Sequence, residues 1–111
     1  MTAAAKERPI FATRLVQARE RLGITQIELG RRAGLDPAVA SPRINQYEKG
    51  LHVPHHTTVK RLAKVLGVPA AFLFAEDDQL AKLLLCWADM SPGERKKLLK
   101  QAEAARKAPE K

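Results

Sequence analysis

The chain has 111 residues, of which 45% are hydrophobic and only five are aromatic, and its formal net charge is +8. A chain of this length buries one modest core, and a composition rich in Ala, Leu and Val but poor in aromatic residues favours helices over sheets. No apolar run reaches transmembrane length, and the first residues lack the apolar centre of a signal peptide. The single cysteine, Cys86, excludes an intramolecular disulfide, so we expect a cytoplasmic protein without membrane contact.

The basic charge gathers at the two ends of the chain. Residues 1–50 and residues 91–111 each carry a net charge of +4, whereas residues 51–90 are neutral. Binding to the phosphates of nucleic acid requires a basic excess, but acidic membranes, acidic protein partners and ordinary solvated helix faces account for such charge as well. The charge alone therefore leaves the partner open.

Two short helices separated by a tight turn are predicted in the first third of the chain. Apolar residues at helical spacing predict a first helix over 11–22, which Gly23 ends. Thr25 and Glu28, three residues apart, form a capping box, so a second helix is expected over 26–33. The apolar residues of the first helix are Phe11, Leu15, Ala18 and Leu22.

The next segment offers two places where a helix could begin. Asp36-Pro37 and Ser41-Pro42 each put a capping side chain before a proline, and the two cannot belong to one straight helix because the second proline would lie inside it. We therefore predict a short turn over 36–40 and a third helix over 42–49, which Gly50 ends.

The helical period divides this third helix into an inward and an outward face. Arg43, Asn45 and Gln46 lie on or at the edge of the outward face, and Arg, Asn and Gln are the side chains that make paired hydrogen bonds to guanine or adenine edges. An ordinary solvated polar face is the alternative interpretation. The outward face also contains Pro42 and Lys49, and the residues expected to point inward are Ile44, Tyr47, Glu48 and Leu51.

Two more helices follow a loop. Thr57 or Thr58 is expected to cap a fourth helix, which Gly67 ends, and Pro69 begins a fifth. The apolar residues of the fourth helix are Val59, Leu62, Ala63 and Leu66, and those expected to point inward from the fifth are Phe72, Leu73 and Phe74.

Three histidines in the loop, His52, His55 and His56, raise the question of a metal site. No cysteine or acidic residue completes a ligand set around them, so we expect no metal and no cofactor. The chain also lacks a nucleophile–base arrangement, paired carboxylates and a glycine-rich phosphate loop, so we do not expect an enzyme.

The last third of the chain predicts two further helices. Acidic residues at 76–78 begin the first, and Ser91 with Glu94 forms a capping box for the second, which continues toward Arg106. The first carries an apolar stripe of Leu80, Leu83, Leu84 and Trp87. These helices either pack on the rest of the chain or form a dimer interface, and the surplus of Leu together with a Trp favours the dimer.

Several landmarks occur in the order and at the spacing of one known family. The segments that carry them are RLVQARERLGITQIELGRRAGL, then INQYEKG, then HTTVKRLAKVLGVPAAFLF. On these segments the chain resembles the Xre-family, phage-repressor (Cro/cI-like) helix-turn-helix proteins. The resemblance implies an all-α fold, with a flexible arm over 1–9, a compact five-helix lambda-repressor-like domain over 10–76, and one or two extra helices over 77–108 for dimerisation.

The resemblance also implies roles for individual residues. Arg43, Asn45 and Gln46 would read bases in the major groove of double-stranded DNA. Arg19 and Glu48 match family positions that form a structural ion pair between the first helix and the end of the third. The residues expected at the DNA backbone are Gln26, Arg31, Arg32, Ser41 and Lys49.

One segment departs from the family pattern. The span from Gly34 to Glu48 is longer by about four residues, or one helical turn, and the extra residues lie in LDPAVASP. They either lengthen the turn or add a helical turn, which affects the assignment of Ser41 more than that of Asn45 and Gln46.

The expected function is therefore sequence-specific DNA binding by a dimeric transcriptional regulator, a repressor, at an inverted repeat. Another possibility is a protein-interaction module, such as an antitoxin, that grips a protein partner with its C-terminal helices. A small enzyme or metal-binding protein built around the histidines is the third possibility.

Overall fold

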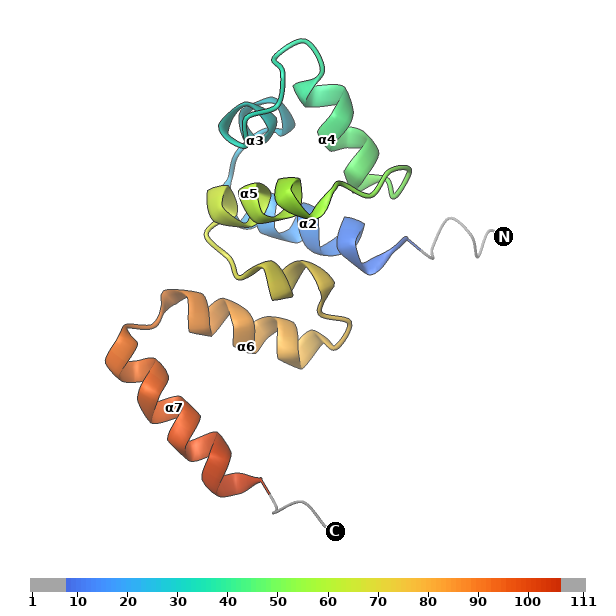
Figure 1. Ribbon diagram of the computed structural model, residues 1–111. Helices are drawn as coiled ribbons and strands as arrows, with labels where there is room; N and C mark the ends of the chain where they lie inside the picture. Colours follow the sequence, from blue (N-terminus) through green and yellow to red (C-terminus); the bar gives the residue numbers. More distant parts are fainter. Residues whose placement is uncertain (1–7, 107–111) are drawn as a thin grey trace.

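The computed structural model describes residues 8–106, and every regular element among them is a helix (Figure 1). The elements are α2 (Ile10–Leu22), α3 (Gln26–Arg32), α4 (Ala40–Glu48), α5 (His56–Leu66), the 3₁₀ helix η1 (Ala70–Phe74), α6 (Asp78–Asp89) and α7 (Pro92–Ala105). The expected all-α fold is confirmed. Most of the predicted N-terminal arm lies outside the described residues.

The hydrophobic core lies where α2, α3, α4, α5 and η1 meet. Its largest fully buried side chains are Leu15, Leu29, Ile44, Leu62, Leu66, Phe72 and Leu73. Burying one such side chain stabilises the fold by about 1.5–3 kcal/mol, so these residues determine how the five helices pack. We refer to residues 10–74 as the core bundle.

Within the core bundle, α3 and α4 approach each other closely because Gly30 has no side chain. A Cβ atom at position 30 would lie 2.7 Å from the Cβ atom of Ala40 and 3.0 Å from the Ala40 carbonyl oxygen. Both residues are buried. The two small residues therefore set the distance between α3 and α4.

The third helix begins two residues earlier than predicted. α4 starts at Ala40 after a turn over 37–39, so Ser41 is helical and Pro42 occupies the third helical position. The helix accommodates this proline because the backbone N–H groups of a first helical turn have no acceptor within the helix. Asp36 shapes the turn instead of capping a helix, since its Oδ1 accepts a hydrogen bond from the Ala38 N–H at 2.9 Å.

The cap of α5 also differs from the prediction. The helix begins at His56, and its N-cap is His55, whose Nδ1 accepts a hydrogen bond from the Thr57 N–H at 3.4 Å. Thr57 and Thr58 are therefore inside the helix. The imidazole nitrogen fills the role that a Ser, Thr or Asp oxygen fills in most helices.

Two side chains expected in the core are exposed. Phe74 is 51% exposed and rests its ring against Phe11 at the edge of the bundle, with centroids 5.5 Å apart. The 3₁₀ geometry of η1 has three residues per turn, so 72, 73 and 74 cannot all face inward. Leu51 is exposed because Gly50, with φ of 77°, turns the chain away from the bundle.

Of the last two helices, α6 lies along the core bundle and α7 extends away from it (Figure 1). α6 packs on η1 and fully buries only Ala81, and α7 buries no side chain. Arg95 joins the two helices: its Nε donates to the Trp87 carbonyl at 2.9 Å, and its guanidinium lies 5.2 Å from the centre of the Trp87 ring. The radius of gyration, 16.4 Å, exceeds the about 13 Å of a compact domain of this size because this α6–α7 arm (residues 78–105) projects opposite α4.

Candidate nucleic-acid interface

The outer face of α4 is polar and accessible. Ile44 and Tyr47 anchor the helix in the core, while Arg43 is exposed and Asn45 and Gln46 are half-buried. Figure 1 shows α4 beside α3 at the end of the molecule farthest from α7. The structure thus places the three candidate base-reading side chains together on one surface helix.

An ion pair holds the C-terminal end of α4 against α2. Arg19 Nε lies 2.5 Å from Glu48 Oε2, and Arg19 Nη2 donates to Glu48 Oε1 at 3.2 Å. The same guanidinium donates to the Ile24 carbonyl at 2.9 Å. The hydrogen bond to Glu48 raises the pKa of Arg19 above its ordinary value, and Glu48 is only 5% exposed. Such a two-point contact fixes the position of α4 on the bundle.

Gln26 connects the start of α3 to the same carboxylate and to the polar face of α4. Its Nε2 donates to Glu48 Oε1 at 2.9 Å and to Asn45 Oδ1 at 3.3 Å. Because the Asn45 oxygen faces Gln26, the Asn45 amide N–H groups remain for an acceptor outside the chain. Gln26, expected at a phosphate, therefore also orients one of the candidate base-reading residues.

The two arginines expected at phosphates share one carboxylate. Arg32 Nε lies 2.6 Å from Glu28 Oε2, and Arg31 pairs with the other oxygen of Glu28. Both arginine side chains remain about half exposed or more. The hydrogen bonds from Arg32 and then Arg31 hold the pKa of Glu28 below its ordinary value. The i, i+3 and i, i+4 spacing of these residues indicates such pairs, although sequence reasoning assigned Glu28 only a capping role.

The other candidate backbone contacts lie at the two ends of α4. Ser41 is half-buried in the first turn, and Lys49 is exposed at the C-cap. Of the loop histidines, His55 caps α5. Between residues 8 and 106, no three His, Cys, Asp or Glu side chains are grouped so that they could hold a metal ion. No helix in this described part of the chain is long and apolar enough to cross a membrane.

Three of the four candidate dimerisation residues line an apolar groove on the α6–α7 arm. Leu80 and Leu83 are nearly half exposed, and Leu84 and Trp87 are half-buried. The groove has a volume of about 240 Å³. Its lining residues are Pro69, Leu83, Leu84, Trp87, Leu98, Leu99 and Ala102. Leu80 lies outside it.

Comparisons with known proteins agree with this geometry. A family model described as helix-turn-helix matches residues 15–73, which is more than half of the chain. Among solved structures, the chain is similar to the crystal structure of the transcriptional regulator BswR, with 42% sequence identity and a TM-score of 0.78. That alignment covers 84% of this chain and 92% of the other. No curated protein matches the chain significantly.

The family match begins in α2 and ends in η1, so it covers nearly the whole core bundle. The chain therefore belongs to the Xre/cI-like helix-turn-helix family, in which the α3–turn–α4 unit is the DNA-binding element. Members of this family are DNA-binding regulators that are typically non-enzymatic.

Proposed function

We propose that the protein is a dimeric transcriptional repressor that recognises a short inverted repeat in double-stranded DNA. The observation that carries the proposal is the accessible polar face of α4, where Arg43, Asn45 and Gln46 lie on a helix that is fixed from behind by the Arg19–Glu48 pair. A rigid helix with such side chains suits the major groove, where bidentate contacts distinguish base pairs.

Contacts to the DNA backbone would surround this face. Gln26 begins α3, Ser41 lies in the first turn of α4, and Lys49 follows its last turn. Arg31 and Arg32 lie exposed at the end of α3, where phosphate oxygens would compete with Glu28 for their N–H groups. Such contacts fix the orientation of the protein on the duplex and carry no sequence information.

Dimerisation is assigned to the C-terminal region, residues 77–108, with the core domain over 10–76 and the arm over 1–9. α7 has 14 residues and buries none of them, and an isolated helix of that length is only marginally stable in water. A second copy covering Leu80, Leu83, Leu84 and Trp87 would remove apolar surface from water. A two-fold dimer of helix-turn-helix domains binds half-sites about 34–36 Å, or one turn of DNA, apart.

Selection of binding sites from a random duplex library at fixed salt tests the central claim. Recovery of a palindromic site is expected, and it would support both sequence recognition and two-fold symmetry. Recovery of no enriched sequence would contradict the proposal. A reporter placed behind the selected site should then be expressed less when the protein is present, and increased expression would contradict the repressor role.

Base reading is tested by Gln46→Ala, which should relax the preference at one base pair by about 1–3 kcal/mol. Arg32→Ala should instead weaken binding to all sequences alike. Gln101→Ala, on α7, removes the same side chain at a distance from the proposed interface and should change neither quantity. Equal losses on specific and random DNA for Gln46→Ala would contradict its role.

The dimer is tested by sedimentation of the full chain. The wild-type protein should sediment as a dimer and Leu83→Asp as a monomer, since the charge would be buried unpaired in the interface. Leu51→Asp, which changes an exposed leucine of the core bundle, should remain dimeric. A monomeric wild-type protein that co-purifies with a stoichiometric second protein would favour the antitoxin-like alternative.

A further inference from the structure

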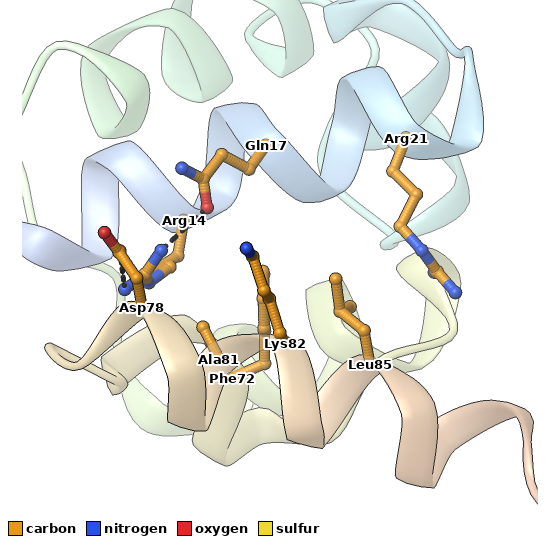
Figure 2. A pocket seen from close by; sticks show the side chains of 8 residues that line it. All are labelled: Arg14, Gln17, Arg21, Phe72, Asp78, Ala81, Lys82 and Leu85. Atoms are coloured by element: carbon orange, nitrogen blue, oxygen red, sulfur yellow. Dashed lines mark hydrogen bonds and ion pairs between the residues drawn. The ribbon is translucent and has the colours of Figure 1, made fainter.

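A cavity of about 410 Å³ lies between α2 and α6 (Figure 2). Its apolar wall consists of Phe72 from η1 together with Ala81 and Leu85 from α6. Gln17 of α2 and Lys82 of α6 face it from opposite sides. The cavity is partly open to solvent, and its volume is far larger than the about 30 Å³ that one water occupies in the liquid, so a small organic molecule could enter it.

Ion pairs connect α2 and α6 at both ends of this cavity. Arg14 Nη2 lies 3.0 Å from Asp78 Oδ1 at the start of α6, and Arg21 Nη2 lies 3.1 Å from Asp89 Oδ2 at its end. The two ion pairs lie at opposite ends of the cavity, and the carboxylate of each pair is largely exposed to solvent.

The buried side chain of Arg14 uses most of its hydrogen-bond donors within the chain. It is 3% exposed, and it donates to the Ala75 carbonyl at 2.7 Å, to Gln17 Oε1 at 3.0 Å, to the Glu76 carbonyl at 3.4 Å and to Asp78. These bonds use four of the five N–H donors of a guanidinium. Arg14 is thus neutralised by Asp78, and one of its N–H groups takes part in none of these four bonds.

Lys82 supplies the uncompensated charge of the cavity. Arg14 and Arg21 each pair with a carboxylate, whereas Lys82 takes part in no ion pair among residues 8–106. Figure 2 shows its side chain extending from α6 toward α2, over Phe72 and between Arg14 and Leu85. One free ammonium beside an apolar wall is complementary to a single negative charge on an otherwise apolar molecule.

We propose that the α2–α6 cavity is a binding site for a small amphipathic monocarboxylate. Its apolar chain would lie on Phe72, Ala81 and Leu85, and its carboxylate would pair with the Lys82 ammonium near the Gln17 amide. The volume lies within the usual range for small-molecule pockets, about 300–1,000 Å³. This site is separate from the DNA-binding face and does not depend on the function proposed above.

Because of the position of the site, ligand binding should strengthen the contact between α6 and the core bundle. Phe72 and Gln17 belong to the core bundle, and Lys82 and Leu85 belong to the α6–α7 arm. A ligand that contacts both would hold α6 more firmly on the bundle, because separating them would expose the ligand and its apolar wall to water.

Titration of the ¹⁵N-labelled full chain with sodium octanoate, below its micelle concentration, tests the proposal. The amide signals of Phe72, Ala81 and Leu85 should shift and saturate together, and amide exchange in α6 should slow. Octan-1-ol, the uncharged probe of the same length, should bind about three- to tenfold more weakly because it lacks the charge that pairs with Lys82.

Lys82→Met retains most of the apolar stem and removes the ammonium. It should lower octanoate affinity by the same factor and leave octanol affinity unchanged, whereas Lys100→Met on α7 should change neither. Absence of saturable shifts, equal affinities of the two probes for the wild-type protein, or saturation at Leu83, Trp87 and Leu99 in the other groove would each overturn the proposal. The wild-type comparison of the two probes decides the matter if Lys82→Met does not fold.

Discussion

The core bundle and the α6–α7 arm use leucine in opposite ways. Leu62, Leu66 and Leu73 of the bundle are almost completely buried. In the arm, by contrast, Leu80, Leu83 and Leu99 keep nearly half of their surface exposed. The helices are similar in length, with 11 residues in α5, 12 in α6 and 14 in α7. Amphipathic helices thus occur in both regions, but only in the bundle does the chain itself cover the apolar face.

The difference shows that helix formation and helix burial have separate causes here. α6 begins at Asp77, whose side chain accepts hydrogen bonds from two backbone N–H groups, and α7 begins at the Ser91–Glu94 capping box. These local signals suffice to start the helices. They provide no partner for the leucines, so the arm should respond to substitution differently from the bundle.

Leu62→Ala should give the largest contrast with the arm. Leu62 is fully buried, so the truncation should lower the free energy of unfolding by about 2–5 kcal/mol in urea denaturation followed by circular dichroism. Leu99→Ala removes the same atoms from a half-exposed side chain and should cost less than about 1 kcal/mol in dilute protein. Equal losses would mean that the arm is packed as tightly as the bundle.

Glu48→Gln tests the ion pair of the bundle against that of the arm. It removes the charge that Arg19 contacts and should cost about 3 kcal/mol, at the low end for buried pairs because the Arg19 side chain is 17% exposed. Asp89→Asn breaks the more exposed Arg21–Asp89 pair and should cost less than about 1 kcal/mol. Thermal unfolding of both variants measures the two losses of stability. A larger loss of stability for Asp89→Asn than for Glu48→Gln would contradict this prediction.

Glu28→Gln should separate the two regions in DNA binding. It frees Arg31 and Arg32 and removes a negative charge near the proposed phosphate contacts, so affinity for any duplex should rise by about two- to tenfold at low salt, with a steeper salt dependence. Glu103→Gln makes the same charge change on α7 and should alter affinity by less than about twofold. Fluorescence anisotropy at fixed salt measures both. A gain in DNA affinity for Glu103→Gln alone would indicate that the DNA binds at the α6–α7 arm.

The smallest effect concerns the pH dependence of stability. The pKa of Glu28 is lower in the folded chain than its ordinary value of 4.5, because Arg32 and Arg31 bond to the ionised form. Its contribution is therefore present above the unfolded-state pKa and is lost as the pH falls through the lower folded-state pKa. Unfolding midpoints measured from pH 7 to pH 3 should decline slightly more for the wild-type protein than for Glu28→Gln. An identical decline of the unfolding midpoint in the two proteins would contradict a stabilising interaction of Glu28 with Arg32 and Arg31.

Local signals made much of the fold predictable. Glycines with positive φ end the first and fourth predicted helices at Gly23 and Gly67, where the structure has them. The predicted capping box of Ser91 and Glu94 is present, with both of its hydrogen bonds. At Thr25 the side chain accepts from the Glu28 N–H as expected, but the Glu28 carboxylate pairs with Arg31 and Arg32. Locality did not always suffice, since the His55 cap of α5 also involves a residue only two positions away and was not predicted.

Features that depend on distant residues were not predictable in the same way. The start of α4 was ambiguous between two Pro-containing sites, and packing of Ala40 against Gly30 accompanies a start that neither site indicated. Arg14 shares the apolar face of α2 with Phe11 and Leu15, which is a usable signal for an unusual buried cation. Apart from Gln17, however, its partners lie more than 60 residues away, and no local pattern points to them.

The contact between Gly30 and Ala40 bears on attempts to change the proposed DNA preference by replacing residues of α4. Replacing Arg43, Asn45 and Gln46 leaves the Gly30–Ala40 contact unchanged, although replacing Asn45 removes the acceptor of a Gln26 hydrogen bond from α3. A transplanted helix with Val or Leu at position 40 should disturb this contact, because Ala40 is buried and a Cβ atom added at position 30 would already lie only 2.7 Å from its Cβ. The outer polar face of α4 should therefore accept side chains of different size, whereas position 40, which faces Gly30, should accept only a small residue.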